Sequence, residues 1–268
     1  RDACAKTQNE SATMSHTVSR QALVNACNEL LQPARFKDYG PNGLQVEGTD
    51  TVRHIVSGVT ASRALIEAAI DAKADAIFVH HGLFWRGQDG TVTGWMKQRL
   101  QLLLAHNINL LAYHLPLDAH PEFGNNAQLG QRLGLKVQGT FGEQDLGLWG
   151  ERADGHGYTS AQALGQAISK ALGRDPLVVQ MPAREIRKVG WCSGGAQGYF
   201  EAAVAAGVDA FITGEISEPQ AHLARETGVA FLACGHHATE RYGAPALAAQ
   251  VAKQLNITHQ FIDIDNPA

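Results

Sequence analysis

Short apolar runs alternate with helix-like stretches along most of the 268-residue chain. In the first half, runs rich in β-branched residues are separated by segments with helical periodicity. Strand, helix, strand, helix and strand are expected, in that order, at 52–60, 61–74, 75–81, 94–107 and 108–114. Strands joined through helices pair in parallel with right-handed crossovers, so this order predicts an α/β fold with mainly parallel sheets.

A second series of the same kind follows a glycine-rich and acidic stretch near residues 142–157. Its expected helices and strands alternate through 159–173, 187–195, 199–207, 208–215, 217–228 and 229–237. Because both series follow the same order, the chain is expected to build two α/β units.

The two series also resemble each other in sequence. When residues 67–82 are set over 201–216, the identical pairs are Glu67 and Glu201, Ala68 and Ala202, Ala69 and Ala203, Asp75 and Asp209, and Ala76 and Ala210. When 108–118 is set over 230–240, His114 falls on His236 and Asp118 falls on Glu240. We therefore predict an internal duplication. Equivalent strands would then end at a shared cleft, which is where open α/β sheets bind ligands.

Histidine and carboxylate side chains gather at the predicted strand ends. The expected members of the cleft are His80, His81, His114, Asp118, His236 and Glu240. Imidazole nitrogens and carboxylate oxygens suit Zn²⁺, Mn²⁺, Fe²⁺, Ni²⁺ or Co²⁺. So many groups would crowd one ion, so the set predicts two divalent metal ions about 3.5–4 Å apart. Adjacent side chains of a strand point to opposite faces, so a turn at Gly82 is expected to let each of the two neighbouring histidines serve a different ion.

Two of the predicted clusters have a clear local context. His236 and Glu240 lie four residues apart in the helical pattern of 236–255, so they share one helix face. Asp118 is expected on a loop that Pro116 makes rigid.

Other polar residues are weaker candidates. Glu215 pairs with His81 in the repeat and is expected to line the cleft, either as a base or as a support for a ligand. His120 and His237 are less favoured as ligands. Histidines expected to be structural or exposed are His54, His106, His156, His222 and His259. The glycines of CSGGAQG match no phosphate-binding loop and are expected to let the backbone approach the cleft, and no GxSxG motif occurs.

Charge and composition exclude several classes of protein. The formal net charge is −4 and no run of Lys or Arg occurs, so nucleic acid is an unlikely partner. No apolar run reaches the roughly 18 residues of a membrane span, and the beginning of the chain lacks a signal-like apolar region, so a cytoplasmic location is expected.

Residues 15–31, after Met14, predict an N-capped helix, which leaves 1–13 as an extension outside the fold. Cys4, Cys27, Cys192 and Cys234 have no metal or disulfide spacing and are expected to be reduced thiols.

The motifs that contain these residues are distinctive. They are YGPNGLQVEG (39–48), VTASRALIEAA (59–69), VHHGLFW (79–85), HLPLDAHPEFGNNAQL (114–129), ITGEISE (212–218) and GHHATER (235–241). The chain resembles the YbgI family of dinuclear-metal proteins, also described as NIF3-like and as GTP cyclohydrolase 1 type 2. The likeness runs from about residue 18 to the C-terminal NPA.

The resemblance implies a ligand set and an architecture. The implied metal ligands are His80, His81, Asp118, His236 and Glu240, with His114 beside the ions in a supporting or catalytic role. It implies two interlocked, internally repeated α/β units, the first from 14–135 with 240–268 and the second from 136–239. It also implies a homohexamer, a toroid with the metal clefts facing its interior.

The expected function is that of a metal-dependent hydrolase acting on a small, nucleotide-like substrate. His114 or Glu215 would move the proton. From the resemblance alone, the reaction would convert GTP into dihydroneopterin triphosphate and formate. The triphosphate would be held by the metals, by Arg86 and Arg241, or by glycine amides. The alternatives are a metal-dependent phosphoesterase or damaged-nucleotide hydrolase, and a non-catalytic metal-binding ring scaffold. Open coordination positions favour catalysis over the scaffold.

Overall fold

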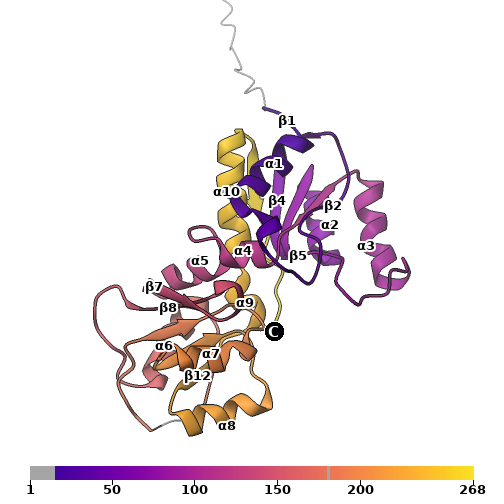
Figure 1. Ribbon diagram of the computed structural model, residues 1–268. Coiled ribbons are helices and arrows are strands. Elements are labelled where there is room, and N and C mark those ends of the chain that lie inside the picture. The colour runs from indigo at the N-terminus through magenta and orange to yellow at the C-terminus, as the bar shows by residue number, and fades with distance from the viewer. Residues whose placement is uncertain (1–15, 180–181) are drawn as a thin grey trace, which may run out of the picture.

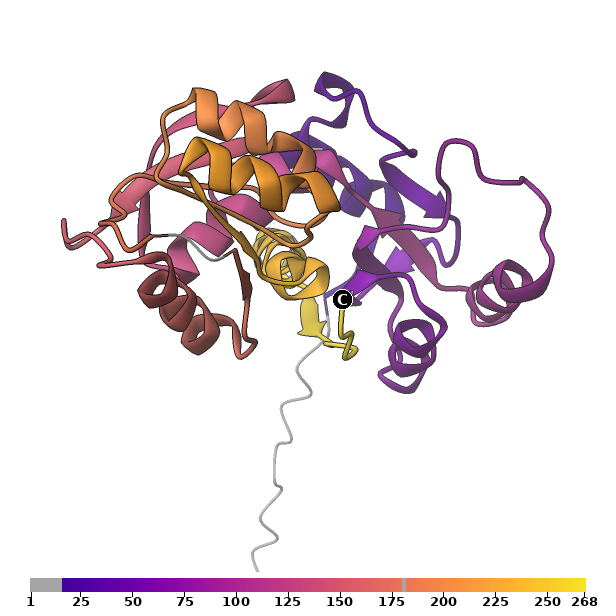
Figure 2. The same ribbon diagram turned by 90° about the horizontal axis from the view of Figure 1, so that it is seen from below.

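Two main β-sheets, each covered by helices, make up the part of the chain that the computed structural model describes, residues 16–179 and 182–268 (Figures 1 and 2). This arrangement confirms the predicted α/β class. The predicted extension 1–13 and Met14 lie outside the described residues. The predicted helix over 15–31 is confirmed only from Arg20 onward, as helix α1 (Arg20–Leu31). Val18 and Ser19 form a short strand instead, and Ser19 is the N-cap, since its Oγ accepts a hydrogen bond from Ala22 N at 3.1 Å.

The first sheet has the order β13-β4-β5-β6-β2, with β2 antiparallel to β6 and the other pairs parallel. Its strands are β2 (Gly43–Val46), β4 (His54–Thr60), β5 (Ala76–His81), β6 (Asn109–Ala112) and β13 (Thr258–Phe261). A small antiparallel pair, β1 (Val18–Ser19) with β3 (Thr51–Val52), lies beside it, and a 3₁₀ turn, η1 (Pro33–Arg35), follows α1. Strand β13 brings the end of the chain back to this sheet, as Figure 1 shows.

Helices cover both faces of the first sheet. Phe78 packs with α1 and α10 (Gly243–Leu255) on one face. Ile77 and Val79 pack with α2 (Arg63–Asp71) and α3 (Gly94–Ala105) on the other. Because both faces are buried, β5 is apolar along its length instead of alternating. The two histidines that end β5 therefore stand out as polar groups at the edge of an apolar layer.

The second sheet has the order β7-β8-β10-β11-β12-β9. Its strands are β7 (Leu135–Phe141), β8 (Gly147–Arg152), β9 (Leu177–Val178), β10 (Val189–Trp191), β11 (Ala210–Thr213) and β12 (Ala230–Ala233). The three central strands are parallel, as predicted, whereas the β7–β8 hairpin and β9 add antiparallel edges that the sequence pattern did not reveal.

Helices on both faces also cover the second sheet. Leu129 of α5 (Asn125–Arg132) and Leu164 of α6 (Ala161–Leu172) pack with Trp191 on one face. Phe200 of α7 (Phe200–Ala205) and Ala224 of α8 (Glu218–Thr227) pack with the opposite face. Two 3₁₀ turns, η2 (Glu143–Asp145) and η3 (Gln197–Tyr199), lie at the end of this sheet that faces the first one.

Matched hydrogen bonds support the internal repeat. Asp75 Oδ2 accepts from the two successive amides of 53–54 at 2.8 and 3.1 Å. Asp209 Oδ2 accepts from the two successive amides of 187–188 at 3.0 and 2.9 Å. In both halves one carboxylate ties the start of a strand to the start of its parallel neighbour.

The predicted pairing of His114 with His236 is wrong by one residue. The residues that precede His114 and Gly235 make the same strand-to-strand backbone bond, at 3.1 and 2.8 Å. His114 is therefore equivalent to Gly235. The sequence alignment matched the two histidines because they are identical residues. The backbone hydrogen bonds show which positions are structurally equivalent, and they differ from that alignment by one residue.

Two local predictions are also wrong. Asp118 lies in a short helix, α4 (Leu115–Ala119), because Pro116 occupies the first turn, where its missing N–H costs nothing. The pattern at 236–255 is divided into α9 (His236–Glu240) and α10. At the break, Gly243 N donates to Asn125 Oδ1 at 3.0 Å in place of a helical carbonyl.

Candidate metal centre

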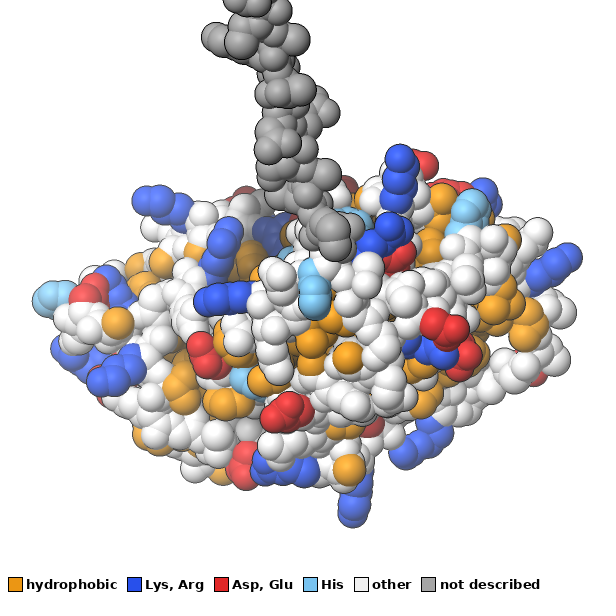
Figure 3. All heavy atoms as spheres, turned by 90° about the horizontal axis from the view of Figure 1, so that it is seen from above, with side chains coloured by type: hydrophobic (Ala, Val, Ile, Leu, Met, Phe, Trp, Pro, Cys, Tyr) orange, Lys and Arg blue, Asp and Glu red, His pale blue; other side chains and the backbone are white. Residues whose placement is uncertain are grey.

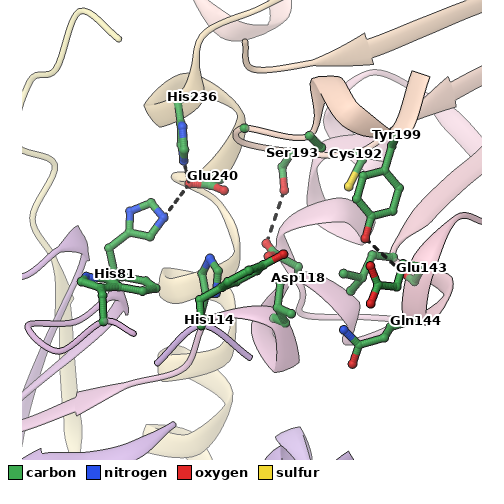
Figure 4. Close-up of a pocket in the computed structure, with 16 residues that line it drawn as sticks. His81, His114, Asp118, Glu143, Gln144, Cys192, Ser193, Tyr199, His236 and Glu240 are labelled. Atoms are coloured by element: carbon green, nitrogen blue, oxygen red, sulfur yellow. Dashed lines mark hydrogen bonds and ion pairs between the residues drawn. The ribbon is translucent and has the colours of Figure 1, made fainter. Parts of the chain in front are cut away.

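The predicted site residues meet where the two sheets face each other. His80 and His81 end β5, His114 and Asp118 lie in the segment after β6, and α9, which follows β12, supplies the third group. Figure 4 shows the labelled members of this set, His81, His114, Asp118, His236 and Glu240, pointing into one space between the two units, with the α9 residues coming from above. Carboxyl ends of parallel strands therefore converge here, as the strand order predicts.

Glu240 is the central carboxylate of the cluster. Its Oε1 lies 3.3 Å from His80 Nε2, and its Oε2 lies 3.2 Å from His81 Nε2. The same Oε2 lies 3.0 Å from His236 Nε2. Asp118 Oδ1 lies 3.5 Å from His80 Nε2 on the other side. The two oxygens of one glutamate thus face two different groups of ligand atoms.

Three overlapping groups of residues can be distinguished, and within each group the donor atoms all lie within 4.8 Å of one another. These groups are His80 with His81 and His114, His80 with Asp118 and Glu240, and His81 with His236 and Glu240. The two groups that contain Glu240 share no other residue. This division is what two neighbouring ions bridged by one carboxylate require.

Each histidine of the cluster presents Nε2 to the centre and has its Nδ1 held from outside. His80 Nδ1 lies 3.1 Å from Tyr113 O, and His81 Nδ1 lies 3.0 Å from Thr60 Oγ1. His236 Nδ1 lies 2.6 Å from Glu215 Oε1. Such outer contacts fix the tautomer and orientation of histidines that bind metals.

The negative charge at the centre is strongly compensated. Burial opposes ionisation of Glu240, but the neighbouring His80 and His81 hold the pKa of this carboxyl well below its usual range. Burial raises the pKa of Asp118. For His80, burial is outweighed by Asp118 and Glu240, which raise its pKa to about 9. The two carboxylates therefore favour a positive charge between them.

The other two histidines of the donor groups, His81 and His236, differ from each other in pKa. Hydrogen bonding to Glu240, against some burial, raises the pKa of His236 to about 9. Burial lowers the pKa of His81 to about 3, and the surrounding histidines add to this effect. His81 is thus neutral at physiological pH, with its Nε2 lone pair directed into the centre, which is the form that binds a metal ion.

Gly194 lets the chain pass close to Glu240. Its φ is +69°, and a Cβ at this position would overlap Glu240 Oε1. Its amide donates to Thr239 Oγ1 at 2.9 Å, which ties the loop to α9. This agrees with the expectation that these glycines admit backbone to the cleft. Gly82, by contrast, is absent from the left-handed glycines of the described chain, and a side chain there would overlap Gln45 instead.

The structure separates the other candidates from the centre. Glu215 is half-exposed and contacts the centre through His236. His237 pairs with Asp263 at 2.8 Å, and His120 accepts hydrogen bonds from the next turn of its own loop. The remaining histidines expected to be structural or exposed also lie outside the three donor groups: His54, His106, His156, His222 and His259. Three of the four cysteines are buried free thiols, Cys27, Cys192 and Cys234, and Cys4 lies outside the described residues.

Asp38 is the residue that the sequence analysis missed. Its side chain is 3% exposed, and its Oδ1 lies 2.7 Å from His114 Nδ1. Despite burial, hydrogen bonds from His114 and Asn42 lower the pKa of Asp38 to about 2. Asp38 directly precedes the YGPNGLQVEG motif, but nothing local in the sequence connects it with a histidine 76 residues away.

The residues present fit a metal centre. Among the described residues, His80 Nε2 and Glu240 Oε2 are buried without a well-oriented hydrogen-bond partner, although nitrogens and oxygens of opposite charge lie nearby. Lone pairs that converge on one space, rather than on a hydrogen, are satisfied by a cation. Nitrogen and carboxylate donors without thiolates suit a divalent ion of intermediate softness.

A cavity of about 370 Å³ opens beside the cluster. His81, His114, Asp118, His236 and Glu240 line one end of it, so the cluster faces the cavity. Tyr39 and Trp85 line it from the first unit, and Tyr199 lines it from the second. A small ligand in this cavity would touch the groups of the cluster.

The chain is similar to known proteins along nearly its whole length. The family model described as Duf34/NIF3 (NGG1p interacting factor 3) matches residues 18–267. A protein of Neisseria meningitidis serogroup A named "GTP cyclohydrolase 1 type 2 homolog" is 53% identical over 251 residues, which cover 94% of this chain and 100% of that protein. A protein of Escherichia coli K12 with the same name is 49% identical over 247 residues, covering 92% of this chain and 98% of that protein.

Solved structures of two similar proteins have the same fold as this chain. The structure described as "protein ybgI, unknown function" superposes with a TM-score of 0.89 at 47% identity, covering 94% of this chain and all of that one (100%). TTHA1606 from Thermus thermophilus superposes with a TM-score of 0.83 at 33% identity, with coverage of 94% and 100%. Within the described residues, no helix is long and apolar enough to cross a membrane.

Proposed function

Because this chain belongs to the Duf34/NIF3 family, and because Glu240 stands between two groups of donor atoms, we propose that it is a hydrolase dependent on two divalent metal ions and acting on a nucleotide-like substrate. The ligands would be His80, Asp118 and Glu240 for one ion, and His81, His236 and Glu240 for the other. The observation that carries the proposal is the position of the Glu240 carboxylate, with Oε1 3.3 Å from His80 and Oε2 3.2 Å from His81.

When bound, a pair of divalent cations supplies Lewis acidity, which makes water more acidic and polarises an atom of the substrate. The chain holds three ligand histidines with Nε2 toward the centre, because their Nδ1 atoms are fixed by outer contacts. Glu215 acts through His236 and is a positioning residue. It holds the His236 ring with a 2.6 Å contact to Nδ1.

His114 is the best placed residue to move a proton. Its ring lies 5.0 Å from the His80 ring and 5.8 Å from the His81 ring, centroid to centroid. Its Nδ1 is held by buried Asp38 at 2.7 Å, so Nε2 is the atom left to exchange a proton with substrate or water. A carboxylate behind a histidine stabilises the charged imidazolium that forms during proton transfer. We assign Asp38 to this positioning role.

The candidate reaction is the hydrolytic opening of a nucleotide ring. Relatives about 50% identical carry the name "GTP cyclohydrolase 1 type 2 homolog", so GTP is the first substrate to test. Protein loaded with Zn²⁺ or Mn²⁺ is incubated with GTP and with simple phosphoesters, and formate, pterin fluorescence and phosphate are measured.

Two variants make this test specific. Glu240→Gln is expected to lose bound metal and turnover together. His222→Gln, at an exposed residue that pairs with Glu218 on α8, is the matched control and is expected to behave as the parent. Full turnover in Glu240→Gln, with an unchanged circular dichroism spectrum, would refute the proposal.

We also propose self-association, with the homohexameric ring of the resemblance as the expected form. Val92, Trp95 and Leu104, on α3 or just before it, are large apolar residues that remain 52–61% exposed. Exposed large apolar side chains of this segment are the candidates for burial between subunits. On the face seen in Figure 3, basic side chains are scattered among acidic and uncharged ones. Light scattering coupled to size-exclusion chromatography measures the number of subunits.

A further inference from the structure

The walls of the cavity differ in chemistry from the site that a triphosphate requires. We infer that the cavity beside the metal centre binds a flat, uncharged aromatic heterocycle, of the size of a nucleobase or nucleoside, in preference to the polyphosphate form of the same nucleoside. This inference rests on the proposed function, because it names the substrate class of the same site. Three observations carry it: the aromatic walls, the missing cations and the occupied amides.

Aromatic side chains line the cavity from both units. Trp85 meets His114 edge to face at 5.0 Å, and Tyr39 meets the same ring at 6.1 Å. Tyr199 lines the cavity from the second unit, where Figure 4 shows its ring beside Glu143. Rings of this kind bind the faces of nucleobases by stacking, which is tolerant of the identity of the base. At about 370 Å³, the cavity is at the lower end of the roughly 300–1,000 Å³ typical of ligand pockets, so it suits a small ligand.

No Lys or Arg is among the described residues that line the cavity. Arg86, expected from the sequence to contact phosphate, is held outside by a 2.8 Å bond from Nη2 to Asp38 O. Arg241, the other expected contact, donates to Leu172 O and lies 3.6 Å from Asp263. Glu143 adds a carboxylate to the wall. Phosphates are normally bound by paired guanidinium or ammonium groups, so the protein wall disfavours a polyanion.

Backbone amides of the glycine-containing loop at 193–196 already donate hydrogen bonds within the protein. Ser193 N donates to Asn126 Oδ1 at 2.7 Å, and Gly194 N donates to Thr239 Oγ1 at 2.9 Å. Ala196 N donates to Thr213 Oγ1 at 3.2 Å. An anion cradle needs successive free amides. The loop that follows β10 therefore does not provide one at these positions.

The wall opposite the metal cluster is preformed. The Gln144 side chain accepts from Lys37 N at 2.9 Å and donates to Lys37 O at 3.1 Å, which ties the second unit to the first. Tyr199 Oη donates to Glu143 O at 3.1 Å. A ligand that stacks on a wall already held in place loses little free energy to ordering it.

The test compares guanosine with GTP by isothermal titration calorimetry, on the protein as isolated with its metal content measured, and again after treatment with EDTA. We expect guanosine to bind at least as tightly as GTP in both states. Trp85→Leu is expected to weaken guanosine binding about tenfold, because the variant removes a ring on which the base stacks. Trp85→Phe should largely restore binding. Leu177→Ala, at an exposed residue of β9 outside the cavity, should leave it unchanged.

The outcomes separate this inference from the proposed function. GTP binding tenfold tighter than guanosine, and weakened by Lys37→Gln or Arg86→Gln, would overturn the inference even if metal-dependent hydrolysis is observed. Guanosine that fails to bind, or that binds Trp85→Leu equally well, would also overturn it. If guanosine binds as expected and Trp85→Leu weakens it, the inference stands, even when no hydrolysis occurs and the proposed function fails.

Discussion

Replacing Asp38 by asparagine gives the sharpest test of the site, because the change is almost isosteric. Asp38 Oδ1 accepts from His114 Nδ1 at 2.7 Å and from Tyr39 N at 2.6 Å. Its Oδ2 accepts from Asn42 Nδ2 and from Leu115 N, each at 2.9 Å. Asparagine keeps one of these oxygens and places an amide N–H₂ against two donors. The substitution therefore removes the charge and leaves buried donors without an acceptor.

Two arguments give the same magnitude for this change. The pKa of Asp38 is lowered from an ordinary 3.8 to about 2, and one pKa unit corresponds to about 1.4 kcal/mol, so ionised Asp38 stabilises the fold by roughly 2.5 kcal/mol. Leaving one buried hydrogen-bond partner unsatisfied independently costs about 1–3 kcal/mol. We therefore expect the free energy of unfolding to fall by about 2–3 kcal/mol at pH 7.

The pH dependence has a defined sign. Because the folded pKa lies below the unfolded one, the stabilisation is complete above about pH 4 and is lost as the pH falls toward 2. Urea unfolding of metal-free protein at several pH values measures the difference between Asp38→Asn and the parent. Asp50→Asn, which removes an exposed partner of Arg20, is the control and should change stability by less than about 0.5 kcal/mol. A similarly small effect of Asp38→Asn, with no change in pH slope, would refute the reasoning.

Three further substitutions or treatments test the centre itself. His236→Ala is expected to lower metal content, measured by elemental analysis, while circular dichroism stays unchanged, because the strands beneath it form their own core; unfolding of this variant would mean that His236 is structural. Gly194→Ala is expected to displace Glu240 and weaken metal binding at least tenfold, since its Cβ would overlap the carboxylate and its φ is +69°; an unchanged dissociation constant would contradict that packing. Removing metal with a chelator should abolish turnover, and adding back Zn²⁺ or Mn²⁺ should restore it, whereas turnover that persists without metal would exclude the proposed mechanism.

Periodicity in the sequence predicts much of the fold, because buried parallel strands and amphipathic helices leave different patterns. The expected strand at 75–81 and the helix at 61–74 correspond to β5 and α2. The antiparallel β7–β8 hairpin was not predicted, since its strands carry exposed residues and glycines that hide the alternation. The break between α9 and α10 depends on a hydrogen bond from Gly243 to Asn125, a residue far away in the chain.

The site, like the fold, could be predicted from the sequence only in part. His80, His81 and Glu240 could be predicted to meet, because they end predicted strands or lie near the start of a predicted helix. The register of His114 could not be predicted, because identity of side chains does not report backbone pairing. Asp38 could not be predicted either, since its role depends on a contact across 76 residues that no local pattern encodes.

The donor atoms of this centre are divided between two bodies, with His80 and His81 on the first sheet and His236 and Glu240 at the end of the second. A cation bound there would cross-link the two units and oppose their separation. Binding to the folded state alone stabilises a protein by about 2.7 kcal/mol when the free ion is 100-fold above its dissociation constant. The melting temperature should therefore follow the free metal concentration, and cells depleted of the metal would hold a protein whose halves come apart more easily.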